Sequence, residues 1–335
     1  MGTLRIVDEL LKSDEPSVRW KVRAKVLSED PGTKSMRALQ AEIRGSPRVR
    51  KLLAPRNSTG RFPSAVYAKW QGAHWVLATL ADIGYPPGDV SLRPMCDQVL
   101  EYWLADFFYQ EFAVEKKSDA YKKKGVPVMC GRYRRCASQQ GNTLFYLTRL
   151  GLTDKRLAQL VERLLHWQWP DGGWNCDKNP AADTSSFMES LLPMCGLAVY
   201  SAATANAKAR AAAILAAEVF LSRRLFKRRS DSQVIHHEFT SLHYPLYWHY
   251  DILGGLKAMA VVGLIRDPRC VDALELLESK QLSDGGWPAE KRYYTQRAGR
   301  ALGSDFVDWG GTNQKRMNPW VTTDALAVLH AAGRI

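Results

Sequence analysis

The sequence has no apolar run close to the ~20 residues that a transmembrane helix requires. Its first residues, Met1-Gly-Thr-Leu-Arg-Ile-Val-Asp-Glu, contain no apolar signal core. Alternating apolar and polar patterns, which are typical of β-strands, are scarce. We therefore expect a mainly helical cytoplasmic protein without a transmembrane segment.

Cofactor and metal motifs with short spacing are also missing. The sequence has no P-loop and no Gly-x-Gly-x-x-Gly loop. Its six cysteines form neither a Cys-x-x-Cys knuckle nor a dense disulfide framework. Three of them lie in apolar helical patterns and are expected in the core, whereas three lie beside loops or helix starts. The first three are Cys96, Cys195 and Cys270, and the others are Cys130, Cys136 and Cys176.

Acidic residues are few compared with basic ones. The 335 residues include 47 Lys and Arg against 34 Asp and Glu, a formal net charge of +13. Such an excess attracts anions, so a nucleic acid, an anionic membrane surface or an anionic small molecule fits as a partner. The net charge does not choose among these three.

Apolar residues recur at three- and four-residue spacing along almost the whole chain, which predicts helices. Two basic helices are expected near the N-terminus, from Pro16 and over Ser35 to Ile43. The further predicted helices cover about 65–84, 93–108, 137–150, 155–168, 185–203, 207–226, 249–264, 269–280 and 320–332.

These helices form pairs, and two pairs end in the same seven-residue pattern. Gln-x-x-Asp-Gly-Gly-Trp occurs at Gln168 to Trp174 and again, 113 residues later, at Gln281 to Trp287. In such a turn glycine supplies a positive φ, and tryptophan folds back as an apolar plug between helices. The glutamine is expected to connect the turn to an adjacent repeat.

On these residues the sequence resembles the squalene–hopene cyclases, through their QW-type motif, and the related protein prenyltransferase β subunits. The resemblance covers residues 61–335 and implies an all-α fold, the α/α toroid, with an inner ring of helices inside an outer ring. Residues 1–60 are predicted to form a separate N-terminal helical extension that is basic. Three segments resemble uncharacterised bacterial squalene-cyclase-like proteins, namely Gly172 to Cys176, Thr184 to Phe187 and Trp248 to Asp251.

Two motifs of these families are absent. The sequence has no Asp-x-Asp-Asp, the proton-donating motif of the cyclases, and no Asp-Asp-x-x-Asp for a magnesium–diphosphate site. Triterpene cyclisation by the usual mechanism is therefore not expected.

In a toroid the inner helices begin at one end of the central cavity, where their dipoles favour anions. Metal-capable side chains fall at these helix starts. Cys136, Cys176 and His249 are predicted to bind zinc with an open fourth position. The alternative is two buried thiols and a hydrogen-bonded imidazole.

Other polar and aromatic residues at the same helix starts complete the predicted site. Asp251, Asp177 and Asp183 are the candidate proton-transfer residues, although Asp183 also fits a helix N-cap. An aromatic wall suits an isoprenoid or a cation, and it equally suits ordinary packing. The predicted substrate-binding residues are Arg135, Gln139, Lys69, Trp70, Tyr247, Trp248 and Trp320.

The resemblance favours an enzyme that acts in the central cavity on an isoprenoid or another anionic substrate, with zinc assisting. One alternative is a carbohydrate-active lyase or hydrolase on the same toroid. A second is a non-catalytic toroid that binds a lipid, a peptide or a nucleic acid. A second subunit, as in the prenyltransferases, stays open.

Overall fold

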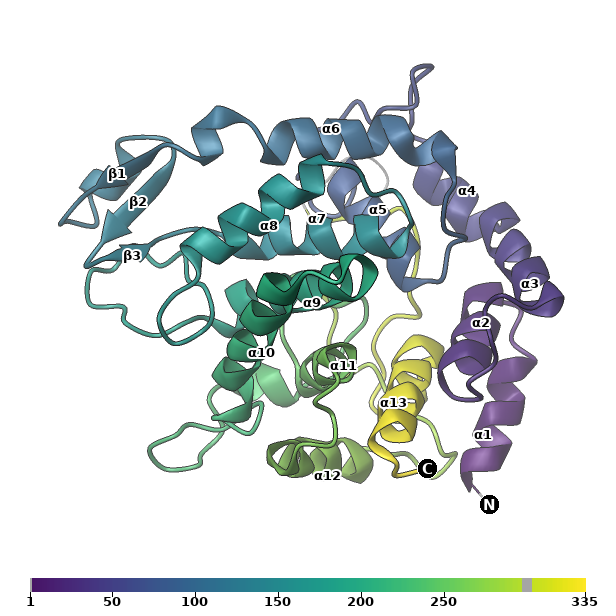
Figure 1. Cartoon of the computed structure of the whole chain (residues 1–335). Coiled ribbons are helices and arrows are strands. Elements are labelled where there is room, and N and C mark those ends of the chain that lie inside the picture. Colours follow the sequence, from purple (N-terminus) through teal and green to yellow (C-terminus); the bar gives the residue numbers. More distant parts are fainter. Residues whose placement is uncertain (1, 297–302) are drawn as a thin grey trace.

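A computed structural model describes residues 2–296 and 303–335. Within these ranges the chain is mostly helical, with one small three-stranded sheet at its edge (Figure 1). The helices are α1 Gly2–Leu11, α2 Pro16–Lys25, α3 Lys34–Gly45, α4 Pro47–Leu53, α5 Ala73–Asp82, α6 Arg93–Trp103, α7 Ala137–Arg149, α8 Arg156–Trp167, α9 Phe187–Thr204, α10 Ala207–Leu221, α11 Ile252–Val262, α12 Val271–Ser279 and α13 Pro319–Ala332.

The sheet is the part of the fold that the expectation of an all-helical chain missed. Strand β2, Val126–Met129, pairs in parallel with β1, Glu111–Ala113, and antiparallel with β3, Arg132–Tyr133. Strands of two to four residues are too short to show clear alternation, which is recognised over four to eight residues. The mainly helical prediction is confirmed, and the sheet is an addition to it.

Five helices pack one after another through the middle of the molecule, in the order α5, α7, α9, α11 and α13. Each of the first four also packs against the helix that follows it in sequence, so α6, α8, α10 and α12 lie outside them (Figure 1). Burial on most sides explains why α5, α9, α11 and α13 are largely apolar, whereas α8 is amphipathic. Among the described residues no helix is long and apolar enough to cross a membrane.

The tightest helix contact joins α7 to α9 and depends on glycine. A Cβ atom at Gly141 would lie 2.3 Å from backbone atoms of Pro193, and one at Gly196 would lie 2.3 Å from the carbonyl oxygen of Gly141. Both distances are too short for real atoms. Glycine therefore allows the two backbones to approach, and this approach positions the first turns of α7 and α9 beside each other.

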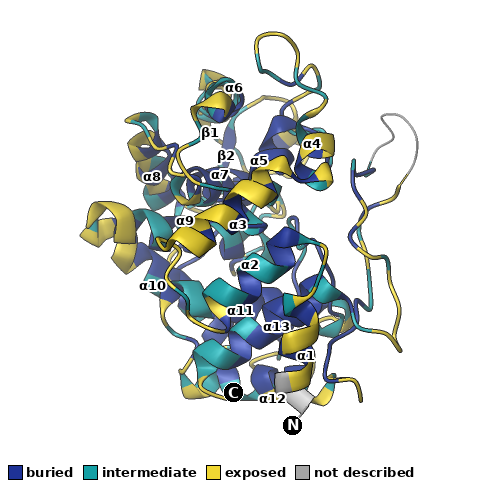
Figure 2. Ribbon diagram, turned by 90° about the vertical axis from the view of Figure 1, so that its right-hand side faces the viewer, coloured by how far each residue is buried: buried dark blue, intermediate teal, exposed yellow. Residues whose placement is uncertain are grey.

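The N-terminal helices share the hydrophobic core of the rest of the chain. Ile6, Val18 and Ile43 are fully buried within it, and α2 packs against α13. Figure 2 shows that exposed residues lie on the outer faces of the N-terminal helices, whereas α11 and α13 are mostly buried. Residues 1–60 therefore contribute core residues, beyond the positive charge predicted for them.

The two repeated turns have the conformation that their sequence predicts. Gly172 and Gly285 have φ values of 100° and 91°. Trp174 and Trp287 are buried, and each indole N–H donates to a backbone carbonyl of the preceding helix. Gln168 also donates to the carbonyl of residue 212 in α10, which confirms the expected connection to the next helix pair.

Candidate functional site

A cavity of about 150 Å³ lies among α5, α7, α9 and α11. The segment 244–247 forms a further wall. Near the helix starts the lining is closed, because Trp75, Asn142 and Leu191 are buried. Near the ends of α5 and α7 it is open, because Arg149 is exposed and Asp82 is partly exposed. The cavity therefore opens at the C-terminal ends of these helices, opposite to the end that the sequence suggested.

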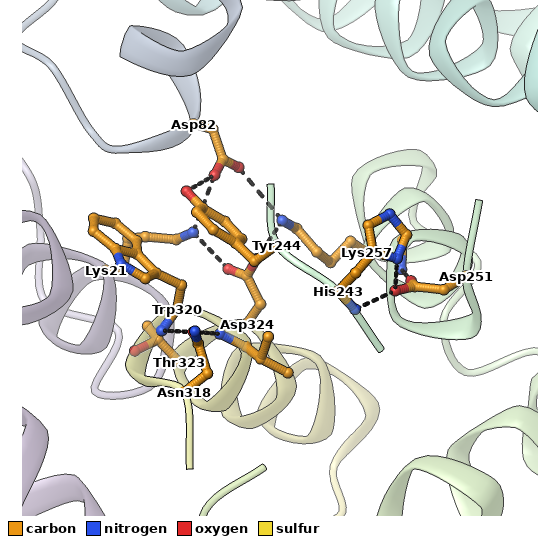
Figure 3. A network of polar contacts seen from close by, with 12 residues as sticks. Lys21, Asp82, His243, Tyr244, Asp251, Lys257, Asn318, Trp320, Thr323 and Asp324 are labelled. Carbon is orange, nitrogen blue, oxygen red and sulfur yellow. Dashed lines mark hydrogen bonds and ion pairs between the residues drawn. The ribbon is translucent and has the colours of Figure 1, made fainter. Parts of the chain in front are cut away.

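A network of ion pairs borders this cavity (Figure 3). Lys21 of α2 lies 2.6 Å from Asp324 of α13 and 3.4 Å from Asp82 of α5. Lys257 of α11 pairs with the same two carboxylates. The Tyr244 hydroxyl donates to Asp82 at 2.6 Å. Four helices that are distant in sequence are thereby joined by charge.

The network favours the charged forms of Asp82 and Lys257. Burial opposes the charge of Asp82, but Lys21 and Lys257 together outweigh it and lower the pKa of that carboxyl. Burial likewise opposes the charge of Lys257, but Asp324 and Asp82 raise its pKa. Side chains of Lys21 and Asp324 are 7% and 4% exposed, so this pair is a buried salt bridge. Such a pair is costly to break, because either partner alone would be an uncompensated buried charge.

Two predicted metal ligands do come together, at the opposite end of the same helices. Cys136 is the N-cap residue of α7, Cys176 follows the turn that ends at Trp174, and Glu189 lies in the first turn of α9. Their ligand atoms are all within 4.8 Å of one another. The Cys176 thiol lies 3.4 Å from a Glu189 carboxylate oxygen. Ligand atoms of a tetrahedral zinc site are separated by about 3.6–3.8 Å, so small movements would suffice to hold the ion.

The surroundings of this Cys–Cys–Glu group favour negative charge. The N-termini of α7 and α9 point their dipoles at it, which stabilises thiolate and carboxylate. Arg135, which precedes Cys136, is buried, and two of its nitrogens have no hydrogen-bond partner among the described residues. Burial lowers the pKa of Arg135, and the nearby charges of Cys136 and Glu189 oppose that effect.

Burial and the close contact within the group act against this attraction at Glu189 and Cys176. Burial raises the pKa of Glu189, and hydrogen bonds from Ser138 oppose the shift only in part. Contact with Cys136, and then burial, raises the pKa of Cys176. Burial, followed by the charges of Cys136, Glu189 and Cys176, raises the pKa of Tyr67, so its hydroxyl keeps its proton and can donate a hydrogen bond.

Glu189 was missed from the sequence for a definite reason. Ser186 and Glu189 have the Ser-x-x-Glu spacing of a helix capping box, which predicts a purely local role. In the structure Glu189 instead accepts a hydrogen bond from the Ser138 amide, at the start of a different helix. The close approach of α7 and α9 makes this contact, and local spacing does not report it.

His249, the predicted third ligand, lies elsewhere. Its ring stacks on Tyr293 and Trp248, with centroids 3.4 Å and 4.2 Å away, and tilts against Trp70 at 5.8 Å. Burial lowers the pKa of His249 to about 3, with His243 and Lys69 adding to the effect. The structure therefore places Glu189, and not His249, beside the two cysteines.

The predicted substrate-binding residues separate into three groups. Lys69 lies over Trp248, and Trp70 stacks on Tyr247 with centroids 3.8 Å apart, so these join the aromatic stack of His249. Arg135 and Gln139 lie at the α7 start, where Gln139 donates to Ser138. Trp320 is separate from both, because it stacks on Tyr244 beside the ion-pair network.

Asp251 has a structural role, because both of its carboxylate oxygens accept hydrogen bonds from backbone amides. One of its oxygens caps α11 by accepting from the Gly254 amide, and the other accepts from the His243 amide. It also pairs with the His243 ring at 2.7 Å (Figure 3). The pair is buried, and the other ring nitrogen of His243 has no partner among the described residues.

The two remaining candidate acids are in a surface loop. Asp177 and Asp183 are both exposed. Asp177 accepts a hydrogen bond from the Asn179 amide, which stabilises the loop after Cys176. The helix N-cap considered for Asp183 falls at Ser186 instead, directly before α9.

Comparisons with known proteins give little further information about this site. No family model and no curated protein matches the chain. A solved structure described as a protein from Actinoplanes covers 99% of this chain and 98% of its own. The sequence identity is 16% and the TM-score is 0.47, so this similarity assigns neither a family nor an activity.

Proposed function

We propose that this chain is an α/α-toroid enzyme that binds Zn²⁺ through Cys136, Cys176 and Glu189 and acts on a substrate with an anionic group. The observation that carries the proposal is the convergence of three ligand atoms within 4.8 Å from three separate segments. The succession of five central helices, four of them with an outer neighbour, supports the toroid.

The donor set fits zinc better than a hard cation. Two sulfur ligands and one carboxylate oxygen are typical zinc donors, whereas Mg²⁺ and Ca²⁺ prefer oxygen alone. Three protein ligands leave a fourth position open, where zinc would supply a Lewis acid and an acidic bound water. Two thiolates and one carboxylate exceed the charge of the ion by one, and the guanidinium of Arg135 is placed to balance it.

The chain's own residues supply the remaining roles. Cys136 is exposed, so the group is accessible from outside. The unpartnered nitrogens of Arg135 would accept the anionic group of a substrate that displaces the surrounding side chains. Tyr67 would donate a proton or a hydrogen bond to a leaving group. An isoprenoid diphosphate and a simpler phosphate or carboxylate ester both fit this description.

Metal content is the test. We expect about one zinc per chain in protein purified without chelators, and a loss of zinc in Cys176→Ser and Glu189→Gln. Cys130→Ser is the matched control, because Cys130 is an exposed cysteine outside the group. The His249→Ala variant should keep its zinc. A folded wild-type protein without zinc, before and after incubation with the ion, would overturn the proposal.

Activity is then assayed with isoprenoid diphosphates and with aryl phosphate and carboxylate esters. The expected pattern is turnover that is lost in Cys176→Ser and reduced in Arg135→Gln. Turnover of polysaccharides with the same variants fully active would favour the carbohydrate-active alternative.

A further inference from the structure

We infer that the central cavity is a second site, a receptor for a small organic acid whose apolar body is about as large as a benzene ring. Its carboxylate or phosphate would lie at the mouth, beside Arg149. This inference goes beyond the proposed function and does not depend on a metal.

The cavity sets the size of the apolar body. Apolar cavities of ~150 Å³ are known to bind benzene, which is the volume found here. A C15 or C30 isoprenoid is far larger. The interior is lined mostly by aromatic and aliphatic side chains, which bind the body of a ligand by burial and stacking. They include Trp75, Phe145, Leu191, Leu192, Leu246 and Val261.

The charges at the mouth set the sign of the head group. Arg149, the last residue of α7, lines the cavity, and its guanidinium lies 4.8 Å from the Phe145 ring. Among residues 2–296 and 303–335 no carboxylate forms an ion pair with it. Lys257 also lines the cavity, but Asp324 and Asp82 already pair with it.

The balance of charge around the mouth is positive. Asp82 and Asp324 pair with Lys21 and Lys257, and the charge of Asp82 also acts on Arg149, so the cations here outnumber the carboxylates. Lys25, on the next turn of α2 after Lys21, adds to the excess. Its pKa is lowered by burial and then by the charges of Arg149 and Lys21, which places these cations near one another.

An arginine at a helix C-terminus is favourable by itself, because it interacts with the negative end of the dipole. That effect explains the position of Arg149 on α7. It does not explain why the same side chain borders an apolar cavity and forms no ion pair with a described carboxylate. A planar guanidinium binds a carboxylate or phosphate through two parallel hydrogen bonds, so an acid bound with its body inside would satisfy both features.

Binding to the full chain is the test, with phenylacetate and phenyl phosphate as the acids and benzyl alcohol and 2-phenylethylamine as matched controls. Quenching of tryptophan fluorescence, to which Trp75 contributes, and calorimetry both report binding. We expect the acids to bind at least about tenfold more tightly than the alcohol, because a charge-assisted hydrogen bond is worth ~1.5–3 kcal/mol. The amine should not bind.

Two variants locate the site. Arg149→Gln should weaken binding of the acids about tenfold or more and leave benzyl alcohol unchanged. Arg210→Gln, which removes an exposed arginine of α10, is the matched control and should have no effect. Ala78→Leu fills the cavity from α5 and should abolish binding of acids and alcohol alike. The circular dichroism spectrum verifies that each variant is folded.

Each outcome of these measurements either supports or overturns the inference. Acid-selective binding that is lost in Arg149→Gln supports the inference, and the better of the two acids identifies the head group. Absence of binding, equal binding of acid and alcohol, or binding that survives in both Arg149→Gln and Ala78→Leu overturns it. Cys176→Ser should bind the acids normally, so failure of the zinc proposal and failure of this one are seen separately.

Discussion

The two ends of the central helices differ in how their buried charged groups are paired. At one end Lys21, Asp82, Lys257 and Asp324 neutralise one another in a closed network. At the other end two thiols and Glu189 gather beside Arg135, whose nitrogens lack partners among the described residues. The paired charges at the first end join helices to one another and so stabilise the fold. At the second end the three ligand atoms can share a cation, and the nitrogens of Arg135 that lack hydrogen bonds can bind an anion.

Of the predicted changes in stability, the loss of one carboxylate from the ion-pair network should be the largest. Asp324→Asn leaves Lys21 and Lys257 with only Asp82, and we expect the free energy of unfolding to fall by ~3–5 kcal/mol. Urea denaturation at pH 7 measures it. Asp272→Asn is the control, because Asp272 also pairs with two cations but on the surface, and its loss should cost ~1 kcal/mol or less. Equal losses in the two variants would contradict a special role of the network.

Zinc bound by the Cys–Cys–Glu group, at the other end of the helices, should instead raise the free energy of unfolding. A zinc concentration of 100 times Kd should raise the free energy of unfolding by about 2.7 kcal/mol, because the ion binds only the folded group. Denaturation with and without Zn²⁺ measures this gain. Cys130→Ser should keep the gain and Cys176→Ser should lose it; an equal gain in both would place the ion elsewhere.

Acid should weaken the core around His74, a fully buried residue of α5 whose ring contacts Tyr146 of α7. Burial lowers the pKa of His74 to about 3, against an ordinary 6.5, so the folded protein keeps this ring neutral. Between pH 6.5 and pH 5 the unfolded chain binds a proton that the folded chain does not. The free energy of unfolding should therefore fall by ~2 kcal/mol over this interval. Urea titrations of wild type and His74→Gln measure the slope, and an identical slope in the two proteins would refute the assignment.

The smallest effect is expected from Glu189 in protein stripped of metal. Because burial raises its pKa, the metal-free protein loses stability as pH rises through the ordinary Glu range toward that raised value. Glu189→Gln should remove this loss and be slightly more stable than wild type at pH 7. In the presence of Zn²⁺ the order should reverse. Thermal unfolding with a chelator and with zinc compares the two, and a variant that is less stable in both conditions would contradict the expected cost.

Local patterns were sufficient for the helices and for the repeated turns. The nine helices predicted between residues 65 and 332 are all present, with ends that differ mainly at α5, α6 and α10. The turns at Trp174 and Trp287 formed as expected, because glycine, aspartate and tryptophan act within a few residues of each other. Helix α1 was not foreseen, and neither were α4 and the small sheet, which are short.

The candidate site was predicted only in part, and the reason is geometric. Cys136 at the start of α7 and Cys176 in the loop before α9 are neighbours, as the sequence predicted. The choice of His249 over Glu189 depended on which helix start lies closest, and that is decided by the contact between α7 and α9. Arg149 was not predicted as a site residue, because arginine is common at helix C-termini. Only the structure shows that a cavity lies beside it.

The sequence by itself therefore determined the helical class, the order of the helices and the conformation of their connecting turns. Periodicity and turn chemistry act over one or two helical turns, and the sequence displays them directly. Only the tertiary structure decided which side chains meet across the molecule: Glu189 with two cysteines, Lys21 with Asp324, and Arg149 with an apolar cavity. These contacts join residues from separate helices, so the packing of the helices, rather than any local spacing, determines them.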